Sequence, residues 1–140
     1  MIKKNKNMAV GFPDKTNPTI WHVSYKGSPD SVFSEGIYHI KIDLAGYPNR
    51  NPKICCLHEN GSFEVNAGLC ISGITSGQFS PGTTVEAIAF AIQSYMPEMH
   101  DRGGAGFIHQ VNPVYAKECA KKSKNFACKE CGVDHSKLFK

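Results

Sequence analysis

One cysteine lies in a stretch that is otherwise rich in turn-forming residues. The segment 58–81 reads HENGSFEVNAGLCISGITSGQFSP, with Cys70 between Leu69 and Ile71. Its glycine, asparagine and serine residues favour turns over regular structure. A surface loop on a rigid scaffold can present a thiol to large partners, whereas a core strand cannot. Cys70 is therefore the first candidate for a reactive group.

A second group of candidate residues lies near the C-terminus, in the sequence CKECGVDH. Cys128 and Cys131, followed by a glycine and then by His135, resemble half of a zinc knuckle. Zinc needs four ligands, and the nearest further cysteine is Cys119, nine residues before Cys128. On the continuous helix that we expect here, these two would lie about 13 Å apart, too far for one ion. The sequence therefore predicts no metal and no cofactor, and it predicts that these cysteines lie on a helix surface or in the core.

Length and charge limit the class of protein. The chain has 140 residues, which predicts a single domain over residues 1–140. Lys and Arg number 16 against 12 Asp and Glu, and the excess is at the two ends, unlike the basic reading face of a nucleic-acid-binding protein. Residues 1–12 have no apolar run typical of a signal peptide, and no run is long enough for a membrane span. We therefore expect a soluble protein of the cytoplasm or nucleus, without nucleic-acid binding.

Alternating apolar residues predict three strands, over residues 20–25, 37–44 and 53–57. Tyr38, Ile40 and Ile42 fall on one face of the second strand, with His39 and Lys41 on the other. The links between the strands are short, which favours an antiparallel meander. Cys55 and Cys56 alternate on the third strand, so that one of them is expected in the core and neither is assigned a function. Residues 1–19 are polar and contain two prolines, so we expect mostly loop there.

Two helices follow the turn-rich stretch. Apolar residues at helical spacing predict the first, beginning after a Thr83–Glu86 capping box and ending at Pro97. Asn112 as N-cap and Pro113 at the first position predict the second, which is expected to stop by Gly132, with one more turn over 133–140. The fold class is therefore α+β, an antiparallel meander flanked by helices.

This order of elements and motifs resembles the ubiquitin-conjugating enzymes over residues 17–126. The likeness is carried by the hairpin WHVSYKGSPDSVFSEG, by YPNRNP, by GLCIS around Cys70 and by FSP, in which Ser80 and Pro81 follow Phe79. The spacing of NGSF to LCIS is similar to that of the endoplasmic-reticulum-associated subgroup, whose members carry a C-terminal membrane anchor. The helix with which the family begins is expected to be short or missing.

The resemblance implies that Cys70 carries ubiquitin, or a relative of it, as a thioester. It receives the modifier from an activating enzyme, which alone uses ATP, and passes it to an acceptor amine or hydroxyl. Asn60, ten residues before Cys70 where most of the family has eight, stands where the family places an asparagine that supports the oxyanion or orders the loop. The candidate supporting residues are Asn66, Ser72, His100 and Asp101.

The resemblance also implies partner surfaces and leaves one alternative. Pro48, Ser80 and Pro81 are the expected contacts for the activating enzyme or a ubiquitin ligase. The alternative is a non-catalytic module of the same fold that binds ubiquitin or a ligase. Cys70 favours the enzyme, since inactive relatives typically lack that cysteine.

Overall fold

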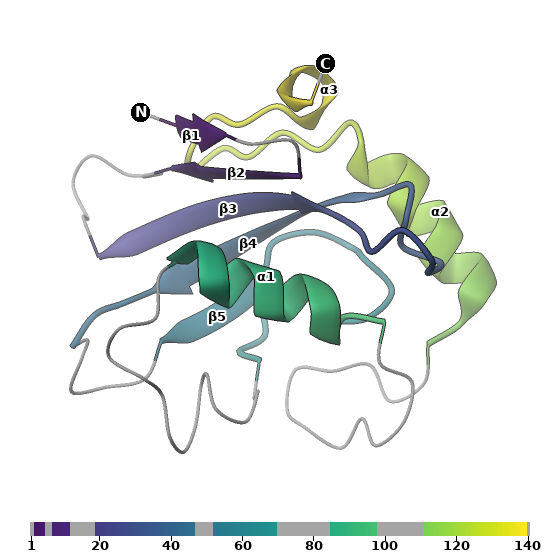
Figure 1. The fold of residues 1–140 in the computed structure, drawn as a ribbon, viewed down its shortest axis with the longest axis horizontal. Helices are drawn as coiled ribbons and strands as arrows, with labels where there is room; N and C mark the ends of the chain where they lie inside the picture. The colour runs from purple at the N-terminus through teal and green to yellow at the C-terminus, as the bar shows by residue number, and fades with distance from the viewer. Residues whose placement is uncertain are drawn as a thin grey trace.

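Within the residues that the structure describes, five strands form one antiparallel sheet in chain order. A computed structural model of the chain describes residues 2–4, 7–11, 19–46, 52–69, 85–97 and 111–139. The strands are β1 (Ile2–Lys4), β2 (Met8–Gly11), β3 (Ile20–Lys26), β4 (Ile37–Asp43) and β5 (Lys53–Cys56). Each strand pairs with the next (Figure 1), so that the predicted α+β fold with an antiparallel meander is confirmed.

The first two strands correct the prediction of loop over residues 1–19. In β2, Met8 pairs with Tyr25 of β3, and Val10 pairs with Val23. Met8 and Val10 are both buried in the core, which stabilises a strand too short to show clear alternation in the sequence. No helix precedes β3 in the described residues 2–4 and 7–11, in line with the expected short or missing first helix.

The two faces of β3 and β4 are both covered. Val23, Tyr25 and Ile40 are fully buried on the face that packs against α1 (Val85–Tyr95), which lies in front of the sheet in Figure 1. His22 and His39 are also buried, on the opposite face of the same strands. The predicted alternation of the strands is therefore confirmed, but the face that carries the histidines is not exposed to solvent.

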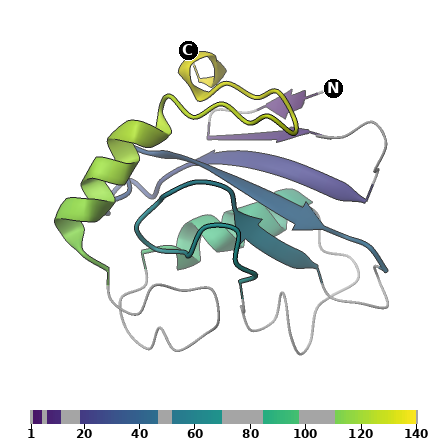
Figure 2. The same ribbon diagram turned by 180° about the vertical axis from the view of Figure 1, so that it is seen from behind.

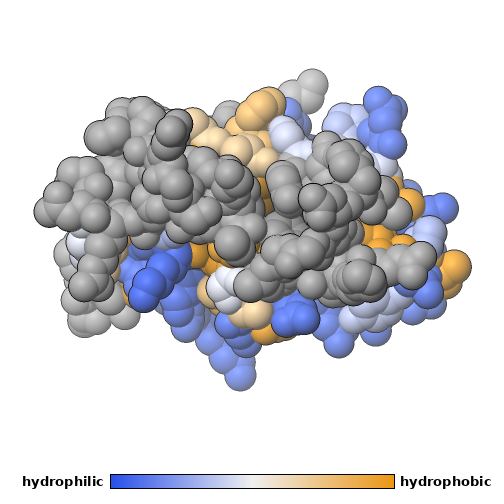
Figure 3. Space-filling view, turned by 90° about the horizontal axis from the view of Figure 1, so that it is seen from below, coloured by the Kyte–Doolittle hydropathy of each residue, from blue (hydrophilic) through white to orange (hydrophobic). Residues whose placement is uncertain are grey.

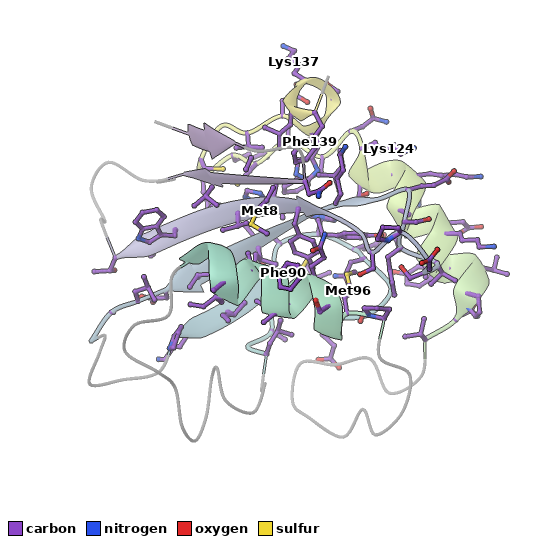
Figure 4. All side chains as sticks on the ribbon, in the orientation of Figure 1. Met8, Phe90, Met96, Lys124, Lys137 and Phe139 are labelled. Atoms are coloured by element: carbon purple, nitrogen blue, oxygen red, sulfur yellow. The ribbon has the colours of Figure 1, made fainter. Side chains whose placement is uncertain are left out.

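Helix α1 follows the predicted apolar stripe. Ile88 and Ile92 are buried, whereas Phe90 on the outer side is 62% exposed (Figure 4). At the end of the helix, the Tyr25 hydroxyl donates to the Met96 sulfur over 3.4 Å. The helix ends just before Pro97, as predicted, whereas Thr83 of the predicted capping box lies outside the described residues.

The second helix begins as predicted but ends earlier. In α2 (Pro113–Ser123), the Asn112 side chain accepts hydrogen bonds from the first turn. The helix stops at Ser123, whose hydroxyl donates to the Ala120 carbonyl and accepts from the Ile37 N–H of β4. The prediction of a helix that continues toward Gly132 is therefore wrong.

The C-terminal segment forms a hairpin instead. Ala127 pairs with Asp134 in an isolated antiparallel bridge, before the short helix α3 (His135–Leu138). Figures 1 and 2 show this segment on the face of the sheet opposite α1. The short helix α3 lies near the N-terminal hairpin that β1 and β2 form. On this side, the Nζ of Lys26 in β3 lies over the Phe139 ring, 5.1 Å from the ring centre.

The lower face of the molecule is mixed in character. Figure 3 shows hydrophobic residues there among hydrophilic ones. Within the described part of the chain, none of the helices is both long and apolar enough to cross a membrane.

Candidate active site

The segment that leads to Cys70 is hydrogen-bonded to the sheet at both of its ends. Residues 57–69 leave β5 and turn back beside it (Figure 2). The Leu57 N–H donates to the His39 carbonyl over 3.1 Å, and the Leu69 N–H donates to the Ile54 carbonyl over 2.8 Å. Leu69 is itself buried in the core. The residue directly before Cys70 is therefore fixed to β5 by a hydrogen bond and by packing.

The same segment is also bound to both long helices. The Ser62 hydroxyl donates to the Met96 carbonyl at the end of α1 over 2.8 Å. Gly61 has a φ of +86°, and a Cβ placed on it would come within 2.8 Å of the Ala116 Cα on α2. Only glycine combines an unstrained positive φ with the absence of a Cβ. The close approach of α2 therefore depends on the glycine of the NGSF motif.

Asn60 is buried and holds this loop from inside. Its Oδ1 accepts from the Ser62 N–H over 2.8 Å and from the Phe63 N–H over 2.6 Å, and its Nδ2 donates to the His58 carbonyl over 2.9 Å. Because both Oδ1 and Nδ2 are engaged within the loop, the geometry supports loop ordering rather than donation to an oxyanion.

His58 is held as a neutral ring. Its Nδ1 donates to the Glu59 carbonyl over 3.0 Å, and its Nε2 accepts from the His39 N–H over 3.0 Å. The ring lies between Tyr38 and Phe126, and burial lowers the pKa of His58 to about 4. Both nitrogens are engaged with the backbone, so that His58 is placed to brace the loop and not to act as a base.

Asn66 occupies a different position from Asn60. It is exposed, its φ is +61°, and its N–H donates to the Cys56 carbonyl over 2.8 Å. Asparagine tolerates this left-handed conformation better than most residues do. A turn residue is therefore sufficient to explain its type.

The other predicted site residues are not covered by the structure. Cys70, Pro48, Ser72, Ser80, Pro81, His100 and Asp101 lie outside the described residues. Among the described cysteines, Cys56 is fully buried and Cys55 is half-buried, which confirms that one of the pair lies in the core. Burial raises the pKa of the Cys56 thiol to about 12, so that it is not a nucleophile at neutral pH.

The structure brings two histidines, which the sequence analysis did not connect with any site, next to the two cysteines of the knuckle pattern. The donor atoms of His22, His39, Cys128 and Cys131 lie within 4.8 Å of one another. His135, which the knuckle pattern had included, is not among them. The sequence did contain a signal for this cluster. Both histidines fall on one face of neighbouring predicted strands, and the Cys-x-x-Cys-Gly turn needs two more ligands to bind a metal.

Comparison with known proteins identifies the family. The family model described as ubiquitin-conjugating enzyme matches residues 1–129. The human and mouse proteins named ubiquitin-conjugating enzyme E2 J1 are each 36% identical over 123 residues, which are 86% of this chain and 38% of theirs. Ubiquitin-conjugating enzyme E2 32 of Arabidopsis thaliana is 33% identical over 91 residues, 63% of this chain and 29% of that protein. The chain thus spans well under half the length of these relatives.

A solved structure supports the same fold. The structure of human ubiquitin-conjugating enzyme E2 G1 matches with a TM-score of 0.58 at 24% identity, covering 67% of this chain and 82% of that chain. The recognition from sequence, including the likeness to the endoplasmic-reticulum-associated subgroup, is confirmed. The order of the motifs, the antiparallel meander and these matches together show that the chain belongs to the ubiquitin-conjugating enzyme family.

Proposed function

We propose that this protein accepts ubiquitin, or a ubiquitin-like modifier, on Cys70 and transfers it to an acceptor. The observation that carries the proposal is the braced segment 57–69, which ends at the buried Leu69 directly before that cysteine. A backbone fixed to the sheet and to both long helices can hold a thiol in one position while large partners exchange around it.

The reaction is acyl transfer in two steps. The Cys70 thiolate attacks the thioester that the activating enzyme carries, and the activating-enzyme thiolate leaves. An acceptor amine or hydroxyl then attacks the new thioester, loses its proton, and displaces the Cys70 thiolate. A thiolate leaves readily, which keeps the modifier activated between the two steps. Nothing in this scheme needs a metal or a cofactor on this chain.

In this proposal, His58 and Asn60 support the loop and do not transfer protons. Asn60 and His58 use their polar atoms on the loop backbone. In this proposal the oxyanion of each tetrahedral intermediate is therefore stabilised by other donors, with backbone N–H groups near Cys70 as the first candidates.

The same proposal includes the partners that the family implies. They are an activating enzyme, ubiquitin or a relative, and a ubiquitin ligase, with Pro48, Ser80 and Pro81 as the expected contacts. The expected location in the cytoplasm or nucleus and the supporting roles of Asn66, Ser72, His100 and Asp101 also belong to it.

A charging assay tests the proposal. With activating enzyme, ATP and a panel of modifiers, the protein should gain one modifier through a bond that a reducing agent cleaves. Cys70→Ala should abolish this adduct, and Cys70→Ser should give an ester that resists thiols, because an alkoxide leaves poorly.

Other cysteines provide the controls for that assay. Cys55→Ala and Cys119→Ala should charge normally, and so should Cys56→Ala where it folds, because burial keeps that thiol protonated. Charging that survives Cys70→Ala would overturn the assignment. A folded protein that binds ubiquitin or a ligase but never charges would instead establish the non-catalytic alternative.

A further inference from the structure

Two histidines and two cysteines converge behind the sheet. The His22 Nδ1 lies 3.6 Å from the Cys128 sulfur, and the His39 Nε2 lies 3.5 Å from the Cys131 sulfur. Three of the four side chains are buried, and Cys131 is half-buried. We infer that His22, His39, Cys128 and Cys131 bind one structural zinc ion, which links β3, β4 and the C-terminal hairpin.

The sheet register places the two histidines together. Ser24 of β3 pairs with His39 of β4, and His22 pairs with Lys41. His22 and His39 are thus diagonal neighbours, whose side chains leave the same face of the sheet within reach of each other. This is the face opposite α1, where the C-terminal segment packs.

The hairpin places the two sulfurs. The Cys128 N–H donates to the Val133 carbonyl over 2.8 Å, and the Gly132 N–H donates to the Cys128 carbonyl over 2.9 Å. Gly132 has a φ of +77°, which favours glycine at this turn.

A chain of hydrogen bonds leaves a lone pair on the metal-facing nitrogen of His39. The His135 Nδ1 lies 2.7 Å from the Ser123 carbonyl and can only donate to it, so that in the neutral ring Nε2 accepts. That nitrogen lies 2.8 Å from the Ser24 hydroxyl, which therefore donates to it and accepts from the His39 Nδ1 over 2.7 Å. With its proton on Nδ1, His39 presents the lone pair of Nε2 to the two sulfurs.

Glu130 favours the tautomer of His22 that has its lone pair on Nδ1. The His22 Nε2 is buried, lies 3.3 Å from a Glu130 carboxylate oxygen, and has no hydrogen-bond partner within the described part of the chain. A carboxylate favours a proton on this nitrogen, which leaves the lone pair on Nδ1. Carboxylates commonly orient metal-binding histidines in this way. The second oxygen of Glu130 lies 3.5 Å from the Lys41 ammonium, which holds the carboxylate in place.

The two lone pairs then face each other. The His22 Nδ1 and the His39 Nε2 are 2.7 Å apart. Two acceptors at this distance repel each other unless a cation lies between them. A metal ion satisfies both histidines together with the two sulfurs.

The donor set and the distances favour zinc. Two thiolates and two imidazoles make a tetrahedral zinc site, in which nitrogen and sulfur ligands lie about 3.5 Å apart. The two nitrogen–sulfur distances above match this value. Around one ion the nitrogens would separate to about 3.3 Å, and the remaining donor pairs, which lie within 4.8 Å, would close to tetrahedral spacing. Two thiolates also neutralise the charge of the ion, which suits a buried site. Hard cations such as Mg²⁺ prefer oxygen ligands.

Four protein ligands leave no coordination position for a substrate, so that the site is structural. Its residues take no part in the thioester chemistry proposed for Cys70. A failure of the metal proposal would therefore leave the conjugation proposal standing, and the reverse holds as well.

Metal analysis and cobalt substitution of the full chain test the inference. Protein purified under reducing conditions and loaded with zinc should retain one ion per chain after gel filtration. Loading with cobalt should give the visible bands of a tetrahedral ion and sulfur-to-cobalt charge-transfer bands. Both measurements use the unmodified chain, so that they do not depend on whether a variant folds.

Variants then assign the ligands. Cys131→Ser should weaken zinc binding by more than about 100-fold in competition with a chromophoric chelator, since loss of a mere orienting residue costs about 10- to 100-fold. Cys55→Ser, which changes another half-buried cysteine, should bind as the unmodified chain does. Ser24→Ala should weaken binding less than Cys131→Ser does, because Ser24 acts through His39.

Three results would overturn the proposal. They are less than stoichiometric zinc after loading, cobalt without sulfur charge transfer, and a loss in Cys55→Ser as large as in Cys131→Ser. A Cys128–Cys131 disulfide that persists under the same reducing conditions would also exclude the site, because it removes both thiolates.

Discussion

At the scale of single residues, Asn60 shows how the loop before Cys70 is held. The backbone N–H groups of Ser62 and Phe63 both depend on its Oδ1, inside a buried turn. The sequence placed this residue at the oxyanion, or alternatively in the ordering of the loop. The observed contacts favour the second role.

Asn60→Ala should therefore lower stability and slow charging and discharge together. The change leaves two buried N–H groups without a partner, each costing about 1–3 kcal/mol. The midpoint of urea unfolding and single-turnover rates of both steps measure the effect. A discharge rate that falls about 10-fold or more while stability and charging are unchanged would return the oxyanion role to this amide.

Asn60→Asp separates the two roles further. Aspartate keeps an acceptor for both N–H groups but loses the Nδ2 donor. If the loop is held mainly through Oδ1, this variant should recover part of the stability and of both rates relative to Asn60→Ala. Equal discharge rates in the two variants, with stability recovered only in Asn60→Asp, would show that the donor matters for catalysis.

At the scale of elements, α2 supports the loop from the side. Ala116 packs against Gly61, and Ser123 at the other end of the helix binds the β4 backbone. The position of the helix depends on its N-cap, where the Asn112 Oδ1 accepts from the Val114 N–H over 3.0 Å and from the Tyr115 N–H over 3.1 Å.

Asn112→Ala should cost about 1 kcal/mol of the free energy of unfolding, the usual effect of losing an N-cap. Asn112→Asp keeps the acceptor and adds a favourable charge at the helix N-terminus, so that it should match or exceed the unmodified chain. Urea unfolding followed by circular dichroism compares the three proteins. Equal midpoints for Asn112→Ala and Asn112→Asp would contradict a contribution from this cap.

At the scale of the whole molecule, the N-terminal hairpin belongs to the same core as the meander. Met8 is 6% exposed and packs in the cluster that holds β3, β4 and α1 together. A segment that the sequence indicated to be loop therefore contributes to the stability of the entire fold.

Met8→Ala should lower the free energy of unfolding by about 2–5 kcal/mol, because it leaves a cavity in the core. Phe90→Ala is the matched control, since it removes a larger apolar side chain from an exposed position on α1 (Figure 4) and should change stability by less than about 0.5 kcal/mol. Chemical denaturation of both variants makes the comparison. A Met8→Ala cost as small as that of Phe90→Ala would place β2 outside the core.

The sequence by itself determined the features that depend on local pattern. The alternation in β3 and β4, the apolar stripe of α1 and the Asn112–Pro113 start of α2 were predictable, because periodicity and capping act over a few residues. The order of the family motifs could also be recognised from the sequence, and it indicated Cys70 as the reactive cysteine.

Only the tertiary structure decided the features that depend on distant partners. β1 and β2 exist because β2 pairs with β3 and buries Met8 and Val10. The early end of α2 frees Cys128 and Cys131 to turn toward the sheet, which no helix propensity predicted. His22 and His39 meet these cysteines across about a hundred positions of sequence, through strand register and hairpin packing. A local pattern cannot encode such a meeting, because the spacing along the chain carries no information about which surfaces come into contact.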